Sequence, residues 1–220
     1  MTPRPPGAHA RKPKPKLGRH DRYLIEADKK LAKLIEARGP IDAATDRRGS
    51  RDAYEALARA IVGQQLSTKA AASIWEKVTA LFGGKTPSPQ QQLDAEPQSL
   101  RDAGLSWSKV AYVRDLAEHV EDGELDLKRL PELPDEDVIA ELTEIKGVGR
   151  WTAEMFLIFH LGRPDVLSTG DLGIRRAIQL TYGLDDLPGP EEMERIAEPW
   201  RPHRTLACLY LWRSLAATPG

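Results

Sequence analysis

Apolar residues recur every three to four positions along most of the chain, and this spacing predicts amphipathic α-helices. The run from Tyr23 to Ile35, for example, keeps its apolar residues on one face and ends at Gly39-Pro40. The predicted helices cover about 23–35, 54–62, 67–81, 89–103, 108–119, 135–143, 151–161, 172–182, 190–197 and 202–216. No stretch alternates with a period of two for long enough to predict a strand. We therefore expect an all-α fold of about ten helices, in two lobes around a cleft.

Composition narrows the class of protein. Apolar residues make up 40% of the 220 residues and charged residues 30%, and no run approaches the roughly 18 apolar residues of a membrane span. The basic, Pro-rich N-terminus lacks the apolar segment of a signal peptide. Cys208 is the single cysteine, which excludes an intrachain disulfide and a four-cysteine iron–sulfur cluster, and the five histidines lack metal-site spacing. We expect a soluble intracellular protein without a membrane partner.

Charge is distributed unevenly along the chain. The net charge is −1, but six of the 32 cations and none of the 33 acids lie in the first twenty residues. Residues 1–20 are therefore predicted to form a disordered basic arm, and residues 21–220 a folded domain with a net charge of −7. An acidic body can contact a nucleic acid only through a local patch, through oriented backbone amides or through the arm.

The segment Leu142–Ala153 combines the end of one predicted helix, a short turn and the start of the next. Gly147 and Gly149 stand in the turn, and glycine permits positive φ and a close approach of the backbone to another surface. The amides that follow lie at a helix N-terminus, which favours an anion, so we expect a phosphate to be held here without sequence preference. A bare Gly-x-Gly could simply join two packed helices, but the longer string is more specific.

This string resembles the helix–hairpin–helix DNA-binding motif, and the resemblance continues along the chain. The loop Gly162–Gly170 and Asp171 stand where helix–hairpin–helix DNA glycosylases place a Gly/Pro-rich loop and an aspartate. Upstream, 59–67 (RAIVGQQLS) is similar to the family's intercalating segment, and 197–212 looks like the closing helix of the 3-methyladenine DNA glycosylase II branch. The resemblance spans residues ~50–215 and implies the fold of the HhH-GPD superfamily, here without an N-terminal β domain.

Asp171 is the catalytic residue that the resemblance implies. A carboxylate facing the sugar of a flipped nucleotide can stabilise an oxocarbenium-like transition state or orient the attacking water. By itself, the same aspartate is more typical of an N-cap for the helix 172–182, and the surrounding motifs are what favour the catalytic role. Trp151 occupies the position at which bifunctional members carry a Schiff-base lysine, so the resemblance implies a monofunctional hydrolase without lyase activity.

The resemblance also identifies residues for the base and the DNA. The base pocket maps onto Trp151, Met155, Tyr210 and Trp212. Indole faces stack favourably on cationic alkylated purines such as 3-methyladenine and 7-methylguanine, although Met155 stands where a related enzyme has an aromatic residue. Gln65 is expected to fill the gap left by the flipped base, with Leu66 as the alternative. The residues expected at the DNA interface are Gln64, Gln65, Leu66, Lys146, Gly147, Val148, Gly149, Arg150 and Thr152.

No cofactor is expected to be required. Family members hold a monovalent cation with carbonyls of the hairpin, and the resemblance maps these onto Thr143, Ile145 and Val148. Such carbonyls leave no signature in the side chains.

The predicted function is release of alkylated purines from duplex DNA by base flipping, which leaves an abasic site for base excision repair. We expect the protein to act as a monomer in the bacterial cytoplasm, at the nucleoid. The main alternative is a non-catalytic helix–hairpin–helix module that recognises distorted DNA, and a further one is a glycosylase for uracil or oxidised bases. A binding module requires the hairpin but has no reason to combine it with Asp171 and a set of tryptophans.

Overall fold

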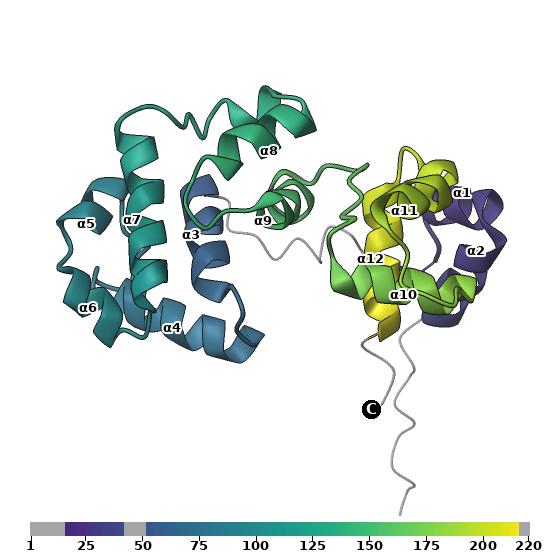
Figure 1. Cartoon of the computed structure of the whole chain (residues 1–220), viewed down its shortest axis with the longest axis horizontal. Helices are drawn as coiled ribbons and strands as arrows, with labels where there is room; N and C mark the ends of the chain where they lie inside the picture. The colour runs from purple at the N-terminus through teal and green to yellow at the C-terminus, as the bar shows by residue number, and fades with distance from the viewer. Residues whose placement is uncertain (1–15, 42–51, 216–220) are drawn as a thin grey trace, which may run out of the picture.

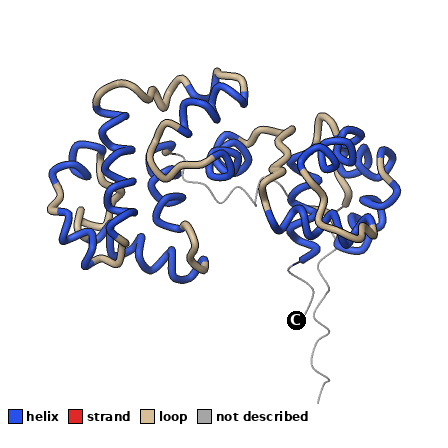
Figure 2. Tube along the Cα trace, in the orientation of Figure 1, coloured by secondary structure: helices blue, strands red, loops and turns tan. Residues whose placement is uncertain are grey.

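The structure is a computed structural model that describes residues 16–41 and 52–215, and within these ranges it is helical without strands (Figures 1 and 2). The α-helices are α1 (Arg19–Ala27), α2 (Lys29–Arg38), α3 (Ala53–Gly63), α4 (Thr68–Ala80), α5 (Pro89–Asp94), α6 (Pro97–Asp102), α7 (Trp107–Glu121), α8 (Asp135–Thr143), α9 (Arg150–Phe156), α10 (Leu172–Tyr182), α11 (Pro190–Ala197) and α12 (Arg204–Leu215). Short 3₁₀ turns lie at Leu130–Glu132 and Glu198–Trp200, and a π-helical turn, η2, covers Leu157–Leu161. The predicted all-α fold is confirmed.

Two hydrophobic cores define two lobes. The first lobe contains α3 to α9, and its core includes Leu57, Leu116 and Leu142. The second lobe packs the N-terminal helices α1 and α2 against α10, α11 and α12, around Trp200 and Tyr210. Helix α9 lies between the other helices of the first lobe and the second lobe (Figure 1), and Phe159 and Trp212 pack against both cores. Helices from the two ends of the described chain therefore share one hydrophobic core.

Three predicted helices, 135–143, 172–182 and 190–197, have the bounds that the sequence indicated. Two others each divide into two helices, which gives twelve α-helices in the described residues instead of about ten. In the first, Asp28 leaves the helical conformation because its carboxylate caps α2 by accepting the amides of Lys30 and Leu31 at 2.8 and 3.0 Å. In the second, Glu96 has extended backbone before Pro97, which begins α6.

The N-terminal boundary also differs from the prediction. Helix α1 begins at Arg19, inside the predicted arm 1–20, because Asp21 accepts the amide of Gly18 at 2.6 Å and closes the first turn. Residues 1–15 of the arm lie outside the described residues. None of the helices in the described parts of the chain has the length and apolar content that crossing a bilayer requires.

Candidate active site

The hairpin joins α8 to α9, and its two glycines have different roles. Gly147 has φ +79°, and a Cβ at this position would overlap the ring of Tyr112. Gly149 instead has φ −90° as the N-cap of α9, and no atom lies within 4 Å of where its Cβ would be. Of the two glycines, only Gly147 uses the positive φ that glycine permits. Its missing side chain leaves open surface at the helix N-terminus, as a close approach to an external backbone requires.

Side chains from other helices hold the hairpin. Asp115, which is 4% exposed, accepts the backbone amide of Lys146 at 2.8 Å and its ammonium at 2.6 Å. Burial raises the pKa of Asp115, but the hydrogen bonds and charge of Lys146, together with His119, lower it below its usual value. The predicted phosphate contact Lys146 is thus engaged within the protein.

Three further residues expected at the DNA interface are paired or buried in the structure: Arg150, Val148 and Thr152. Arg150 donates to Glu136 at 2.6 and 2.9 Å and to Glu154 at 3.1 Å, while the side chains of Val148 and Thr152 are buried. The hairpin therefore presents the backbone at the start of α9 together with the side chain of Arg150, which is 56% exposed although it is paired with acidic residues.

The segment between α3 and α4 lies against the hairpin. Lys109 donates to the carbonyls of Val62 and Gln64 at 2.7 Å each, which satisfies the C-terminus of α3. The Gln64 amide donates to the Gly147 carbonyl at 2.7 Å and ties the two segments together. Gln65 takes φ 59°, which is rare for a residue with a side chain, and Leu66 is exposed. The side chain of Gln64 is therefore engaged, and Gln65 and Leu66 are the residues at the tip.

Asp171 accepts three hydrogen bonds at the start of α10. Its Oδ1 accepts the Ile174 amide at 2.7 Å and the Trp212 indole Nε1 at 2.9 Å, and its Oδ2 accepts the Trp151 Nε1 at 2.8 Å. The same carboxylate therefore caps the helix and lies between two tryptophans from different lobes. Three donors fix the orientation of the carboxylate.

The chain between Gly162 and Asp171 is held from both lobes. Thr205 of α12 accepts the Val166 amide at 3.0 Å and donates to the Arg163 carbonyl at 2.7 Å. On the other side, the fully buried Ser168 donates to Glu154 of α9 at 2.5 Å. Burial raises the pKa of Glu154 above its usual value, although the Ser168 hydrogen bond and Arg150 oppose this effect. The sequence analysis did not identify Glu154 and Ser168. The one signal that could have indicated them was the acidic residue Glu154 on the otherwise buried face of α9.

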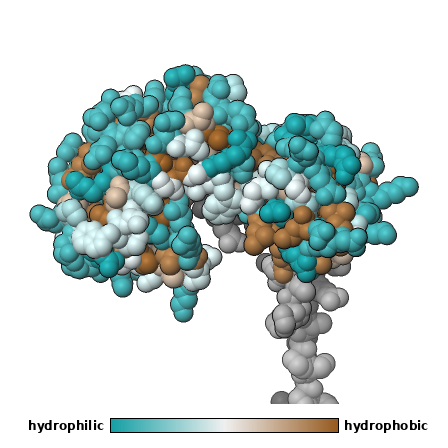
Figure 3. All heavy atoms as spheres, in the orientation of Figure 1, coloured by the Kyte–Doolittle hydropathy of each residue, from teal (hydrophilic) through white to brown (hydrophobic). Residues whose placement is uncertain are grey.

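Trp151 and Met155 line a groove of about 610 Å³ with residues of α3 and the tip that follows it, among them Arg59, Gln65 and Leu66. Trp151 belongs both to this groove and to the cluster around Asp171. The surface is hollowed between the lobes, and an apolar area covers α10 on the second lobe (Figure 3), where Leu172 and Leu180 are exposed.

Tyr210 does not belong to the site, and its predicted role in the base pocket is wrong. The side chain is fully buried in the core of the second lobe, donates to Asp21 at 2.6 Å and accepts the Ile41 amide at 3.2 Å. Trp212, two residues further along α12, points to the other side of the helix and reaches Asp171.

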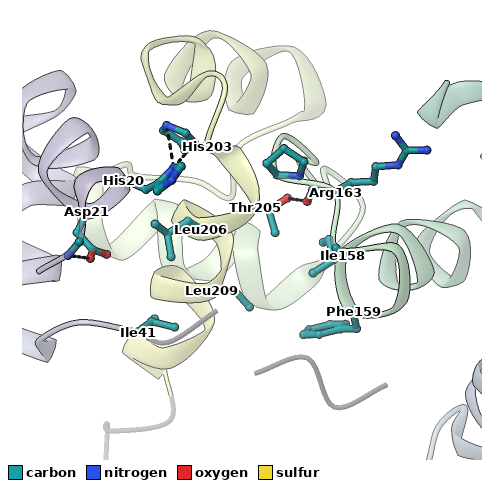
Figure 4. Close-up of a pocket in the computed structure, with 13 residues that line it drawn as sticks. His20, Asp21, Ile41, Ile158, Phe159, Arg163, His203, Thr205, Leu206 and Leu209 are labelled. Atoms are coloured by element: carbon teal, nitrogen blue, oxygen red, sulfur yellow. Dashed lines mark hydrogen bonds between the residues drawn. The ribbon is translucent and has the colours of Figure 1, made fainter. Parts of the chain in front are cut away.

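A second cavity, of about 360 Å³, lies between α1, η2 and α12 (Figure 4). Its walls are mainly apolar, with Phe159 on one side and the contacting pair His20 and His203 on another. The residues that line it include none of the predicted site residues. We therefore assign the site to the groove and cluster around Trp151 and Asp171.

Known proteins share this architecture and sequence pattern. Residues 58–202 match the family of HhH-GPD superfamily base excision DNA repair proteins. A Bacillus subtilis protein is 34% identical over 168 residues, and the chain spans 58% of that relative's length. A Bacillus halodurans DNA-3-methyladenine glycosidase superposes with a TM-score of 0.81 at 38% identity, covering 91% of this chain and 90% of the other.

A further solved structure is the 3-methyladenine DNA glycosylase of Schizosaccharomyces pombe in complex with abasic DNA. It superposes with a TM-score of 0.80 at 31% identity, covering 91% of this chain and 98% of the other. Together with the hairpin and the helix-capping aspartate, these matches define the class: the chain belongs to the HhH-GPD superfamily of base excision DNA repair proteins. Within that superfamily, the relatives named here for their activity are 3-methyladenine glycosylases.

Proposed function

We propose that this protein is a monofunctional DNA glycosylase that hydrolyses the N-glycosidic bond of alkylated purines, such as 3-methyladenine and 7-methylguanine, in duplex DNA. The product is an abasic site for base excision repair. The observation that carries the proposal is the Asp171 carboxylate, held by the indoles of Trp151 and Trp212 beside a helix–hairpin–helix turn. The names of the related 3-methyladenine glycosylases support the substrate class.

The chemistry requires one carboxylate. Alkylated purines that carry a positive charge are already activated leaving groups, so no acid is needed to protonate them. As the bond to the base breaks, positive charge develops on the sugar, and a preorganised carboxylate stabilises it. Water then adds at C1′ and loses a proton, which leaves the abasic sugar. Trp151 stands where a lyase would carry an amine, so the chain offers no Schiff-base nucleophile at this position.

The groove beside Asp171 is suited to a flat cationic ring. The exposed face of Trp151 can stack on such a ring, and this attraction grows when water is excluded. Met155 forms an adaptable apolar wall rather than a second aromatic face. Gln65 or Leu66, at the tip that lines the same groove, fills the gap left in the base stack.

The hairpin binds the DNA backbone, and we propose that it does so with a monovalent cation. Thr143 ends α8, so its carbonyl is among those without an intrahelical donor. The Ile145 carbonyl accepts the Val148 amide at 3.0 Å and keeps one lone pair. With the Val148 carbonyl these groups would supply oxygen ligands to the cation, which would place positive charge where the hairpin meets a DNA phosphate. Replacing K⁺ by tetramethylammonium at equal ionic strength should weaken DNA binding; equal affinity would contradict the cation.

The remaining expectations are part of the same proposal. The protein acts as a monomer on duplex DNA, in the cytoplasm at the nucleoid, where its substrate lies. A non-catalytic module for distorted DNA is not favoured, because such a module has no use for an aspartate held by two tryptophans. Uracil and oxidised bases are neutral and need activation as leaving groups, for which this cluster offers no additional acid.

The test compares the wild type with Asp171→Asn on methylated duplex DNA, with the released bases identified by chromatography. Asparagine retains an oxygen that can cap α10, so the variant should fold, and its binding to DNA should remain. We expect the wild type to release 3-methyladenine or 7-methylguanine and the variant to lose this by several orders of magnitude. Release by both proteins would assign the chemistry to another residue, and release by neither, with binding intact, would favour the non-catalytic module.

A further inference from the structure

Gly173, the second residue of α10, lies against the cluster around Asp171. A Cβ on Gly173 would lie 3.0 Å from Asp171 Oδ1, 3.3 Å from Trp212 Cδ1 and 3.5 Å from Trp212 Nε1. Two of these atoms, Trp212 Nε1 and Asp171 Oδ1, form the hydrogen bond by which Trp212 donates to Asp171, and Cδ1 is the ring carbon bonded to Nε1. A side chain at residue 173 would therefore press directly on that hydrogen bond.

The atoms around Gly173 have little freedom to move away. The carboxylate of Asp171 is tied to the Ile174 amide and to Trp151 as well as to Trp212. The indole of Trp212 also stacks on Phe159, with ring centroids 5.9 Å apart and planes at 25°. Because these contacts come from α9, α10, α12 and η2, an added methyl group would displace the indole from the carboxylate rather than move a loose surface group.

Backbone conformation does not explain the glycine. Gly173 lies within a regular helix and is not among the glycines with positive φ. Glycine at a helical position is less favourable than alanine because it loses more conformational freedom. The space that Trp212 needs is therefore the physical reason that the structure offers for a glycine here.

We propose that Gly173 is a positioning residue for base release: its lack of a side chain lets Trp212 reach and orient the catalytic Asp171. This inference rests on the proposed glycosylase activity. It adds a determinant that acts through Trp212 and does not itself touch the substrate.

The experiment measures single-turnover base release from methylated duplex DNA for the wild type, Gly173→Ala, Trp212→Phe and the double variant. We expect Gly173→Ala to slow release about tenfold to a hundredfold, the range that a small misplacement of a reacting group can produce. Its DNA affinity should match that of the wild type, and the variant should remain folded because the higher helix propensity of alanine offsets part of the packing strain. Phenylalanine lacks the indole Nε1 that donates to Asp171, so the Trp212→Phe protein has no such hydrogen bond for the added methyl group to disturb, and Gly173→Ala should slow it no further.

The matched control is Gly189→Ala, at the N-cap of α11 in the same lobe. No atom lies within 4 Å of a Cβ at Gly189, so this variant should release base within about twofold of the wild type. A wild-type rate for Gly173→Ala would overturn the proposal. Multiplicative losses in the double variant would also overturn it, because they would show that Gly173 does not act through Trp212.

A spectroscopic measurement separates this inference from the proposed activity. The indole N–H resonance of Trp212, identified by its absence from the Trp212→Phe spectrum, reports its hydrogen bond to Asp171. Gly173→Ala should shift this resonance, and Gly189→Ala should not. If the wild type releases no base, the proposed activity fails and the resonance alone decides the geometric claim: a shift supports it, and an unchanged resonance overturns it.

Discussion

Ser168 and Glu154 connect the hairpin to Asp171, the proposed catalytic residue. The Ser168 hydroxyl donates to the buried carboxylate of Glu154 at 2.5 Å, and the Ser168 carbonyl accepts the Asp171 amide at 3.3 Å. Glu154 in turn accepts from Arg150, the first residue of α9. A continuous set of hydrogen bonds therefore runs from the helix that begins at the hairpin to the backbone that carries Asp171.

Ser168→Ala should slow base release about tenfold while DNA affinity changes by less than twofold, because the loop that places Asp171 loses its tie to α9. The unpartnered oxygen of Glu154 should also lower the free energy of unfolding by about 1–3 kcal/mol. Single-turnover kinetics, fluorescence binding and urea denaturation measure these effects. Thr79→Val, which removes a hydroxyl that donates to the Glu76 carbonyl within α4, is the control. An unchanged rate with reduced stability would assign Ser168 a purely structural role.

Gly149→Val should weaken binding to damaged and undamaged DNA alike, by about tenfold, because the added side chain stands on the surface at the start of α9. Gly189 provides a matched position: it is also an N-cap with extended backbone, and neither glycine has an atom within 4 Å of its Cβ position. Gly149→Val and Gly189→Val should both have a thermal stability close to that of the wild type. Equal DNA affinities for the two variants would contradict the assignment of the hairpin as the DNA-binding element.

Tyr210→Phe should reduce stability and leave base release unchanged per folded molecule. The substitution removes the hydroxyl that donates to Asp21 and accepts the Ile41 amide, and a buried polar group left without a partner costs about 1–3 kcal/mol. Urea denaturation and single-turnover kinetics separate the two effects. If the variant instead has full stability and an altered selectivity among methylated bases, Tyr210 belongs to the base pocket.

Stability should fall in mildly acidic solution because of His203. Burial lowers the pKa of His203, the charges of His20 and Arg19 lower it further, and Asp165 opposes them. The unfolded chain therefore binds this proton more readily than the folded chain does. The contribution of His203 is present above about pH 6.5 and is lost as the pH falls through the folded-state pKa. Urea denaturation from pH 8 to pH 5 should show a smaller loss for His203→Gln than for the wild type, and equal losses would refute the assignment.

Local patterns predicted most of the helices and the core of the site. The bounds of α8, α10 and α11 follow from apolar spacing, proline and capping residues, which act within a few positions of the chain. The hairpin and Asp171 were also recognisable, because a glycine turn and a carboxylate at a helix start are properties of short strings. Both interpretations of Asp171, as a helix cap and as the candidate catalytic group, describe the same carboxylate.

What the sequence could not supply depends on contacts between distant segments. The break at Asp28 is stabilised by Tyr182 and by Trp200, which are 154 and 172 positions away. Likewise, the predicted phosphate contact Lys146 is paired with Asp115, which belongs to α7 and lies outside the hairpin motif. The partners of Asp28 and Lys146 cannot be predicted from local spacing, because other charged or hydrogen-bonding side chains of the chain could meet the same requirement.

By itself, then, the sequence determined that the chain is helical, where most helices begin and end, and that a glycine hairpin precedes an aspartate. The tertiary structure decided which side chains meet at that aspartate. Tyr210 and Trp212 are two residues apart on one helix, so they point to different sides. The packing of α12 against α2 and α10 determines that Trp212 reaches Asp171 and that Tyr210 lies in the core. Helix periodicity is set by neighbouring residues, whereas the face that a helix turns toward a site is set by everything that packs against it.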